Sequence, residues 1–299
     1  MITFARYSEG EFDLQIRGTL MLLLAAFIWG TTFVAQMTGM ENLEPFSYAA
    51  SRFFLGFIFL VGLWIYRLRF RTSNHVSGFK AGLGAGLFMF IASSLQQVSM
   101  LYTTAGKAAF ITCLYIIFVP LASVFLRKKI RPENWIGAIL AICGLYLLAI
   151  HEDFSVGAGD LMLLVSSFFW TAQILFIDRF ASKVDVVELS TAQIFVCMIL
   201  SSIVAIGFES PTFESIGSAW FSIFYGGIMS AGVAFTLQIV GQKYAEPSTA
   251  AIVMSFESIF GALSAWILLN EIMSSREIYG CFLMLIGMIV TQMKMKFRI

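Results

Sequence analysis

Long apolar stretches, separated by short polar turns, run along almost the whole chain. A helix needs about 20 apolar residues to cross a bilayer, and ten stretches approach this length. They cover residues 17–37, 45–66, 79–100, 105–126, 133–150, 159–177, 186–208, 219–241, 247–269 and 276–293. The turns between them leave no room for a separate soluble domain. The pattern therefore predicts an all-α membrane protein with ten transmembrane helices.

Composition points to the same class of protein. Hydrophobic residues make up 59% of the 299 residues and charged residues 12%, whereas about a quarter of a soluble domain is charged. A surface covered by lipid needs few charges. The net charge of +1 argues against a nucleic-acid partner, which requires a clustered basic face. We expect the lipid bilayer to surround the protein.

The basic residues predict the orientation of these helices. If the N-terminus lies in the cytoplasm, all 19 lysines and arginines except Arg52, Lys107 and Arg276 fall on the cytoplasmic side. Basic segments resist translocation across the membrane. We therefore expect both termini to be cytoplasmic in a multi-pass protein of the inner (plasma) membrane.

The chain also repeats itself at a nearly constant offset of 141–143 residues. The matched pairs include Trp29 with Trp170, Arg52 with Gln193, Gln96 with Gln238, and Gly144 with Gly287. Residues 17–150 and 159–293 are thus predicted to form two repeats of five helices. Because five is odd, the repeats insert with opposite orientation. Inverted repeats are typical of secondary transporters that bind their substrate near the bilayer midplane.

Three segments resemble EamA-type permeases of the drug/metabolite transporter superfamily. They are FIWGTTF at residues 27–33, LYTTAGKAAFITCLYIIFVP at 101–120 and FESIFGALSAWILLNE at 256–271. The resemblance implies ten helices, cytoplasmic termini and a central cavity lined mainly by the first, third, fourth, sixth, eighth and ninth helices. The second half departs from the family pattern. Thr171 and Ala172 follow Trp170 where Gly-Ser or Gly-Thr is usual, and Ser258 stands where a proline is frequent.

Polar residues inside the predicted helices are candidate substrate contacts, because such groups need a partner or a water-filled cavity. Trp29, Thr32 and Gln36 form one stripe on the first helix. Trp170 and Gln173 repeat this stripe on the sixth helix. The stripes either line a cavity for a partly polar solute or hydrogen-bond between helices.

Glutamines near the ends of two predicted helices form a second group of candidates. Gln96 and Gln97 end the third helix, and Gln238 lies near the end of the eighth. The inverted topology places these ends near opposite membrane surfaces, where the amides would contact substrate or act as paired gates. The neighbouring Tyr102 and Tyr244 either join the gates or anchor the helices at the interface.

Three further residues complete the candidate list, and a fourth polar residue, Arg52, is expected to have a different role. Lys107 begins the fourth helix from the outer side, where it either snorkels or meets an anionic group. Tyr115 follows on the same helix, within the family motif. Glu257 lies near the middle of the ninth helix, where burial favours the protonated carboxyl group, so it either couples transport to protons or forms a structural hydrogen bond. Arg52 on the second helix is expected to snorkel or to pair with a carboxylate.

Glycines predict one close helix contact. Gly137 and Gly144 share a helical face, as do Gly280 and Gly287, and small residues allow backbones to approach. We expect the fifth and tenth helices to pack together within one chain, with a dimer contact as the alternative. The protein is accordingly expected to be a monomer or a weak homodimer.

No pattern in the chain predicts catalysis or a cofactor. The two histidines, His75 and His151, lie in predicted loops, so no metal site is expected. A glycine-rich phosphate loop is also missing. We therefore expect a secondary-active transporter, not an enzyme, that exports a small metabolite, an amino acid or an amphipathic compound by alternating access. An uncoupled facilitator or channel for small solutes is the alternative.

Overall fold

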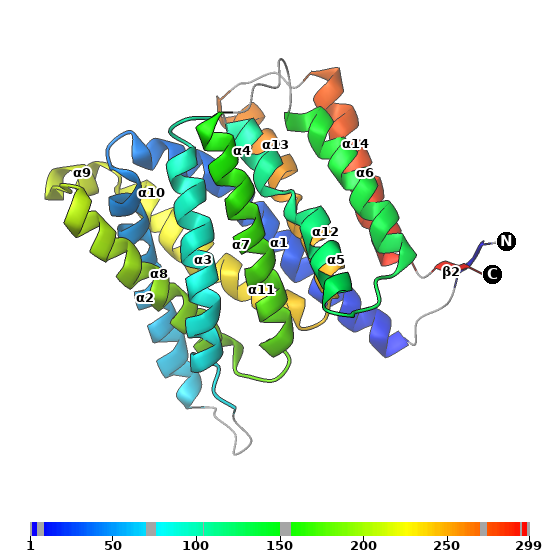
Figure 1. Cartoon of the computed structure of the whole chain (residues 1–299). Coiled ribbons are helices and arrows are strands. Elements are labelled where there is room, and N and C mark those ends of the chain that lie inside the picture. The colour runs from blue at the N-terminus through cyan, green and yellow to red at the C-terminus, as the bar shows by residue number, and fades with distance from the viewer. Residues whose placement is uncertain are drawn as a thin grey trace.

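The computed structural model describes residues 2–4, 9–69, 76–103, 105–149, 157–269, 274–293 and 295–297. Most of these residues are helical (Figure 1). The helices are α1 (Glu9–Met40), α2 (Pro45–Leu68), α3 (Phe79–Ser99), α4 (Ala105–Thr112), α5 (Tyr115–Phe125), α6 (Pro132–Ala149), α7 (Ala158–Phe180), α8 (Val186–Phe208), α9 (Phe213–Ser218), α10 (Trp220–Phe224), the π-helix η1 (Tyr225–Ala234), α11 (Phe235–Gln242), α12 (Pro247–Met254), α13 (Glu257–Leu269) and α14 (Ser275–Gln292). Two short strands, β1 (Ile2–Phe4) and β2 (Met295–Phe297), pair near the chain ends. The predicted all-α class is confirmed.

Six helical segments in the described part of the chain are long and apolar enough to cross a membrane. They are Asp13–Met40, Pro45–Leu68, Phe79–Ser99, Ala158–Phe180, Val186–Phe208 and Trp220–Gln242. Two shorter apolar helical segments, Phe110–Phe125 and Pro132–Leu148, accompany them. The protein is therefore a multi-pass membrane protein, as the hydrophobic pattern predicts.

Two of the predicted helices are interrupted. The predicted fourth helix is divided into α4 and α5, and the predicted ninth helix into α12 and α13. At the first break, the backbone N–H of Ile116 donates to the carbonyl of Cys113 at 2.9 Å. At the second, the N–H of Ser258 donates to the carbonyl of Ser255 at 3.1 Å. Both bonds reach back three residues, as in a 3₁₀ turn, so the regular α-helical ladder stops at each break.

Apolar side chains face outward and many polar side chains face inward. Ile206 and Phe208 of α8 are 80% and 87% exposed, whereas Gln173 and Gln193 are fully buried. Lipid solvates apolar side chains and leaves polar groups to find partners inside the bundle. This distribution fits a surface in contact with acyl chains.

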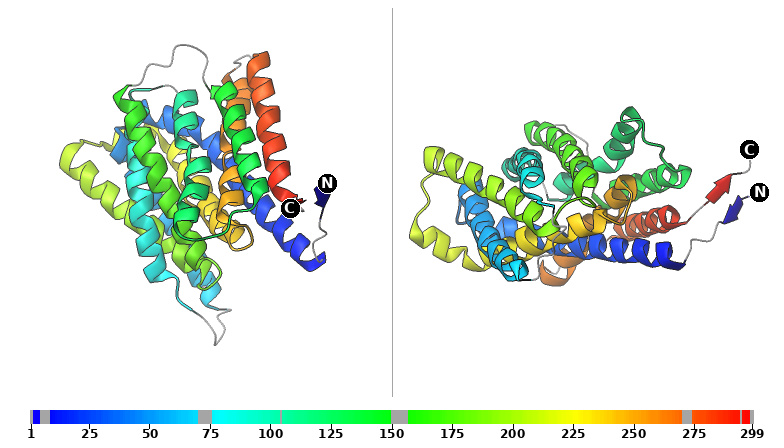
Figure 2. Two further views of the ribbon diagram at one scale, coloured as in Figure 1. Left: turned by 45° about the vertical axis from the view of Figure 1, so that its right-hand side comes forward. Right: turned by 90° about the horizontal axis from the view of Figure 1, so that it is seen from below.

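Glycines join α6 and α14, which lie side by side at one edge of the bundle (Figures 1 and 2). Gly144 faces Gly280, and a Cβ on either residue would lie 2.5 Å from the carbonyl oxygen of the other. Gly137 and Gly287 face each other in the same way, at 2.7 Å. The predicted packing of these glycine-bearing helices within one chain is therefore confirmed.

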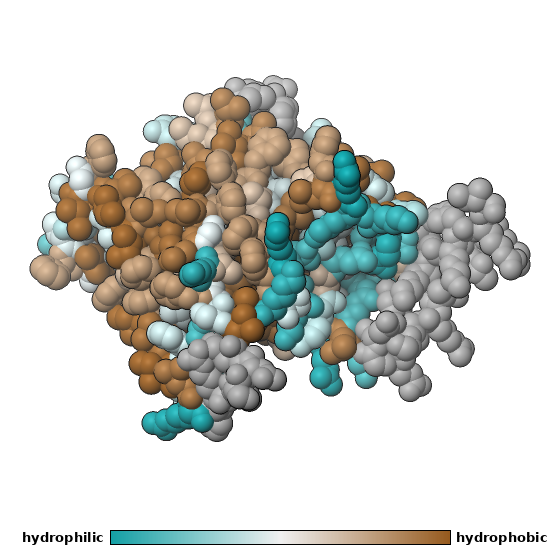
Figure 3. All heavy atoms as spheres, turned by 60° about the horizontal axis from the view of Figure 1, so that its bottom comes forward, coloured by the Kyte–Doolittle hydropathy of each residue, from teal (hydrophilic) through white to brown (hydrophobic). Residues whose placement is uncertain are grey.

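One end of the bundle carries a set of ion pairs. Arg67 lies 3.5 Å from Asp185, and Arg131 lies 3.0 Å from Glu246. Each pair joins segments far apart in sequence. Figure 3, which brings the bottom of the Figure 1 view forward, shows hydrophilic side chains gathered beside broad hydrophobic areas. The chain thus has a polar end suited to water and apolar sides suited to lipid.

Candidate substrate site

The two helix interruptions meet inside the bundle. Tyr115 is the first residue of α5 and Glu257 the first residue of α13. They occupy corresponding positions of the two halves, 142 residues apart, and the Tyr115 hydroxyl donates to Oε1 of Glu257 at 3.3 Å. Cys113 adds contacts from its Sγ to the same carboxylate oxygen at 3.5 Å and to Ser258 Oγ at 3.3 Å. The break in each half therefore contacts the break in the other.

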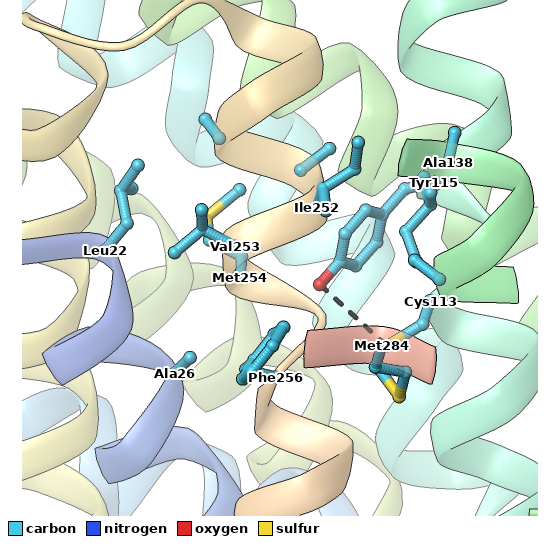
Figure 4. Packing of buried hydrophobic residues seen from close by; sticks show 14 of the residues in the cluster. Leu22, Ala26, Cys113, Tyr115, Ala138, Ile252, Val253, Met254, Phe256 and Met284 are labelled. Atoms are coloured by element: carbon cyan, nitrogen blue, oxygen red, sulfur yellow. Dashed lines mark hydrogen bonds between the residues drawn. The ribbon is translucent and has the colours of Figure 1, made fainter. Parts of the chain in front are cut away.

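Apolar side chains surround this polar cluster. Figure 4 shows the Tyr115 ring directed from its helix toward the α12–α13 break, with Cys113 beside it. Cys113 Sγ lies 3.9 Å from the Tyr115 hydroxyl. Ile252 and Phe256 belong to the same buried packing cluster. Because water-poor surroundings make unpaired polar groups costly, these hydroxyl, thiol and carboxyl groups depend on one another.

A cavity of about 60 Å³ lies beside the cluster. Its wall combines aromatic, amide, hydroxyl and charged groups from both halves of the chain. The main groups are Trp29, Phe33, Tyr115, Trp170 and Phe235; Gln36, Gln96 and Gln238; Ser93, Thr112 and Ser230; and Arg52 and Glu257. A volume this small holds one or a few water molecules, whereas pockets for metabolites measure about 300–1,000 Å³. The cavity in this structure is therefore smaller than a metabolite pocket.

Seven of the sequence-predicted site residues line this cavity. They are Trp29, Gln36, Gln96, Tyr115, Trp170, Gln238 and Glu257. The two tryptophans are matched in the sequence repeat, one from each half of the chain, and they belong to one aromatic cluster. Phe235 lies between them, with ring centroids 4.9 Å from Trp29 and 6.0 Å from Trp170. Trp170 Nε1 also donates to Gln96 Oε1 at 3.1 Å, which links α7 to α3.

Three other predicted site residues lie off the cavity wall in helix contacts. The Thr32 hydroxyl donates to the carbonyl of Ile28 at 2.6 Å. The Gln97 side chain contacts the Met40 sulfur. Gln173 accepts from Gln238 Nε2 at 3.0 Å, so it supports a wall residue without reaching the cavity. Their direct binding to substrate stays a prediction.

Some predicted residues cannot be placed. Lys107 belongs to α4 by its backbone, but its side chain lies outside the described part of the structure. His75 and His151 also lie outside the described residues. Within the described ranges, no group of three or more His, Cys, Asp and Glu side chains is positioned to hold a metal ion.

Arg52 is the main functional candidate that sequence reasoning missed. Its side chain is 5% exposed and belongs to the cavity wall, so the expected snorkelling to the surface is wrong. No described carboxylate lies within ion-pair distance of it. Its guanidinium instead lies over the ring of Phe53, 4.6 Å from the ring centroid. The available signal was its repeat counterpart Gln193, a second polar residue that is fully buried.

Within the described part of the chain, three polar atoms on the wall are buried without a hydrogen-bond partner. They are Trp29 Nε1, Arg52 Nε and Thr112 Oγ1. Buried polar groups are normally paired, and unpaired ones at a cavity require an explanation. A bound solute or water can satisfy these groups, which is the behaviour expected of a binding site.

Similarity to other proteins supports the transporter class. An "Uncharacterized transporter" of Archaeoglobus fulgidus is 29% identical over 281 residues, covering 94% of this chain and 87% of that protein. The "Uncharacterized transporter YoaV" of Bacillus subtilis is 22% identical, covering 91% of this chain and 96% of its own length. Solute carrier family 35 member F6 of Mus musculus is 23% identical over 64% of this chain and 58% of its own length.

A solved structure and a family model extend this similarity. One crystal structure matches with a TM-score of 0.77 and 21% identity over 92% of this chain and 96% of the other. That likeness establishes the fold alone. The model of the EamA-like transporter family matches twice, at residues 16–150 and 157–293. The resemblance drawn from the three motif segments is confirmed: this chain is a membrane transporter that belongs to the EamA-like transporter family.

Proposed function

We propose that the protein is a secondary-active transporter that moves a small molecule by alternating access. The observation that carries the proposal is the meeting of the α4–α5 and α12–α13 breaks beside a central cavity. Discontinuous helices at corresponding positions of two halves are typical of transporter binding sites. A break also frees backbone groups and offers a hinge. The cavity is the substrate site in this proposal.

Two inverted repeats of five helices, residues 17–150 and 159–293, form the proposed architecture. Counting α4–α5 and α12–α13 as one interrupted span each, and the continuous helical segment α10–η1–α11 as one span, leads to ten spans. Matched contacts support the inversion. A Cβ on Gly18 would lie 2.9 Å from Tyr244 Cβ, and a Cβ on Gly159 would lie 2.9 Å from Tyr102 Cβ. Exchanging the halves converts one contact into the other.

Both termini are proposed to be cytoplasmic, in the inner (plasma) membrane. The antiparallel pairing of β1 with β2, with Ile2 opposite Phe297, supports their common side. The basic ends of α2 and α5 support the cytoplasmic assignment, because positive residues remain on that side. The glycine contact between α6 and α14 lies within one chain, which favours a monomer or a weak homodimer.

The proposed direction is export of a small metabolite, an amino acid or an amphipathic compound. The aromatic and amide groups of the wall suit a solute with apolar and polar parts. Active export requires a coupled species that binds differently in the two states. Glu257 is the proposed proton carrier, because its contacts with Tyr115 and Cys113 would break when the helix breaks separate.

Flux through proteoliposomes tests this function. Purified full-length protein, supplied with a panel of radiolabelled metabolites, is expected to show saturable uptake and counterflow of at least one compound. Counterflow requires a carrier that returns with bound solute. Non-saturating flux without counterflow would favour a channel, and saturable counterflow with no dependence on any ion gradient would favour an uncoupled facilitator. Saturable transport lost on collapse of the pH gradient would support coupling to protons.

A further inference from the structure

Arg52 is a buried cation that the described protein does not neutralise. The side chain is 5% exposed, its Nε has no hydrogen-bond partner, and it lines the central cavity. An arginine inside a membrane is costly and normally pairs with an acid or with backbone carbonyls. The rings of Phe53 and Tyr48, 4.6 and 5.8 Å from the guanidinium carbon, supply cation–π contacts. Such contacts leave the hydrogen-bond donors of the guanidinium free.

Two glycines of the π-helix η1 leave room for the Arg52 side chain. Gly226 and Gly227 of η1 face α2, and a Cβ on Gly226 would lie 3.5 Å from Arg52 Cδ. A Cβ on Gly227 would lie 2.7 Å from the Arg52 carbonyl oxygen, so a side chain there would displace the helix. The glycines let the long arginine side chain lie between helices and reach the wall.

The rest of the wall complements a charged solute with an apolar body. Among the described wall residues, Arg52 is the only basic side chain and Glu257 the only acidic one. Glu257 already accepts from Tyr115, whereas Arg52 has no anionic partner among the residues that the structure describes. Trp29 and Trp170 each pack against Phe235 on the same wall. The three rings supply an apolar surface for the body of such a solute.

We propose that Arg52 is the anion-binding residue of the cavity and that the transported solute is a small organic carboxylate. Its carboxylate would accept the guanidinium donors, and its apolar body would lie against Trp29, Phe235 and Trp170. Arginine suits this role because its planar fork matches a carboxylate. The inference rests on the transporter function proposed above and names the charge of its substrate.

Arg52→Gln tests the assignment without requiring a new fold. The counterpart of Arg52 in the second half is Gln193, which is fully buried, so an uncharged amide fits the corresponding environment. The control is Arg69→Gln, at the exposed end of the same helix. The melting temperature of each purified full-length protein is measured with 3-phenylpropanoate, with its neutral isostere 3-phenylpropanamide, or with the zwitterion L-phenylalanine. Counterflow of the same three probes is measured in proteoliposomes.

The carboxylate probes are expected to raise the melting temperature of wild type and Arg69→Gln, and the amide is not. In Arg52→Gln the apparent affinity for the carboxylates falls about 10- to 100-fold, the loss expected for hydrogen bonds to a charged group. Without probe, Arg52→Gln melts at or above the wild-type temperature, because an unpaired buried charge has been removed. A structural arginine would instead lower that temperature.

Three results would overturn the assignment. These are equal binding of amide and carboxylate, unchanged carboxylate affinity in Arg52→Gln, or no stabilisation of wild type by either carboxylate. Saturable counterflow of the amide that is unaffected by Arg52→Gln would reject the anion site and leave the transporter function standing. If wild type also binds L-phenylalanine more tightly than 3-phenylpropanoate, and Glu257→Gln removes this preference, that result supports the proposal and assigns Glu257 to binding of the ammonium group.

Discussion

The residues at the two helix breaks form a small network that crosses from one half of the chain to the other. Tyr115 and Glu257 occupy equivalent positions of the repeat, yet one is a donor and the other an acceptor. Two ionised carboxylates at these positions could not make this bond, because neither carries a donor. The two halves differ at these equivalent positions, so the contact between the breaks is asymmetric.

Replacing the carboxyl group tests proton coupling at this contact. In Glu257→Gln the amide oxygen still accepts from Tyr115, but the side chain no longer takes up and releases a proton. We expect transport driven by a pH gradient to fall at least about tenfold, while counterflow without a gradient continues. Vesicle uptake with and without an imposed gradient measures both. Glu214→Gln, on the exposed α9 helix, is the control, and full gradient-driven uptake in Glu257→Gln would refute coupling at this residue.

The contact between α6 and α14 depends on glycines that let the two helix backbones come close together. In the α6–α14 pair, the shortest distance from an added Cβ to a backbone atom is at Gly144 and Gly280, where a methyl group would meet a carbonyl oxygen at 2.5 Å. The carbonyl belongs to a helix backbone and cannot rotate away as a side chain would. The pair must therefore separate to admit even one carbon atom.

Gly144→Ala is expected to destabilise the protein by about 1–3 kcal/mol, the usual cost of overpacking. Thermal unfolding in detergent, followed by circular dichroism, measures the change. Gly62→Ala in α2 is the matched control, because no described atom beyond its own stretch of helix lies within 4 Å of a Cβ added there. Alanine also favours the helix by about 1 kcal/mol relative to glycine, so the control should be neutral or stabilising. Equal effects of the two substitutions would contradict the contact.

The sequence predicted helix positions better than helix interruptions. The stretch 105–126 is apolar on both sides of Cys113, so hydrophobicity could not reveal the break. Pro120, the residue that most suggests a kink, lies inside the continuous helix α5. The wide turns of η1 escaped prediction because α- and π-helices bury the same kinds of side chains. These features depend on the partner helix, which local sequence does not encode.

The sequence repeat marked several residues that line the cavity. Trp29 with Trp170 and Gln96 with Gln238 were found as matched pairs, and all four line the cavity. Arg52 was misjudged because its chemistry suggested a surface position, although its match to Gln193 indicated the interior. Whether Thr32 or Gln173 reaches the cavity depends on the rotation of each helix, which a stripe of polar residues does not fix.

At the scale of the whole molecule, the two halves enclose one small cavity between interrupted helices. Its volume of about 60 Å³ is too small for a metabolite. In the alternating-access mechanism proposed above, the halves separate at one end and close at the other. The contacts between Tyr102 and Gly159 and between Gly18 and Tyr244 lie at opposite ends of the bundle and are the natural candidates for these closures.

Reversible cross-linking of these closures tests alternating access most directly. One variant carries Gly18→Cys and Tyr244→Cys, and a second variant carries Gly159→Cys and Tyr102→Cys. In each variant the two Cβ atoms lie about 2.9 Å apart, and a small shift reaches disulfide geometry. Alanine replaces the exposed Cys143 and the half-buried Cys281 beforehand, and single-cysteine variants control for the oxidant. We predict that either disulfide stops counterflow in proteoliposomes and that reductant restores it. Undiminished counterflow in either variant with its disulfide fully formed would contradict the alternating-access account.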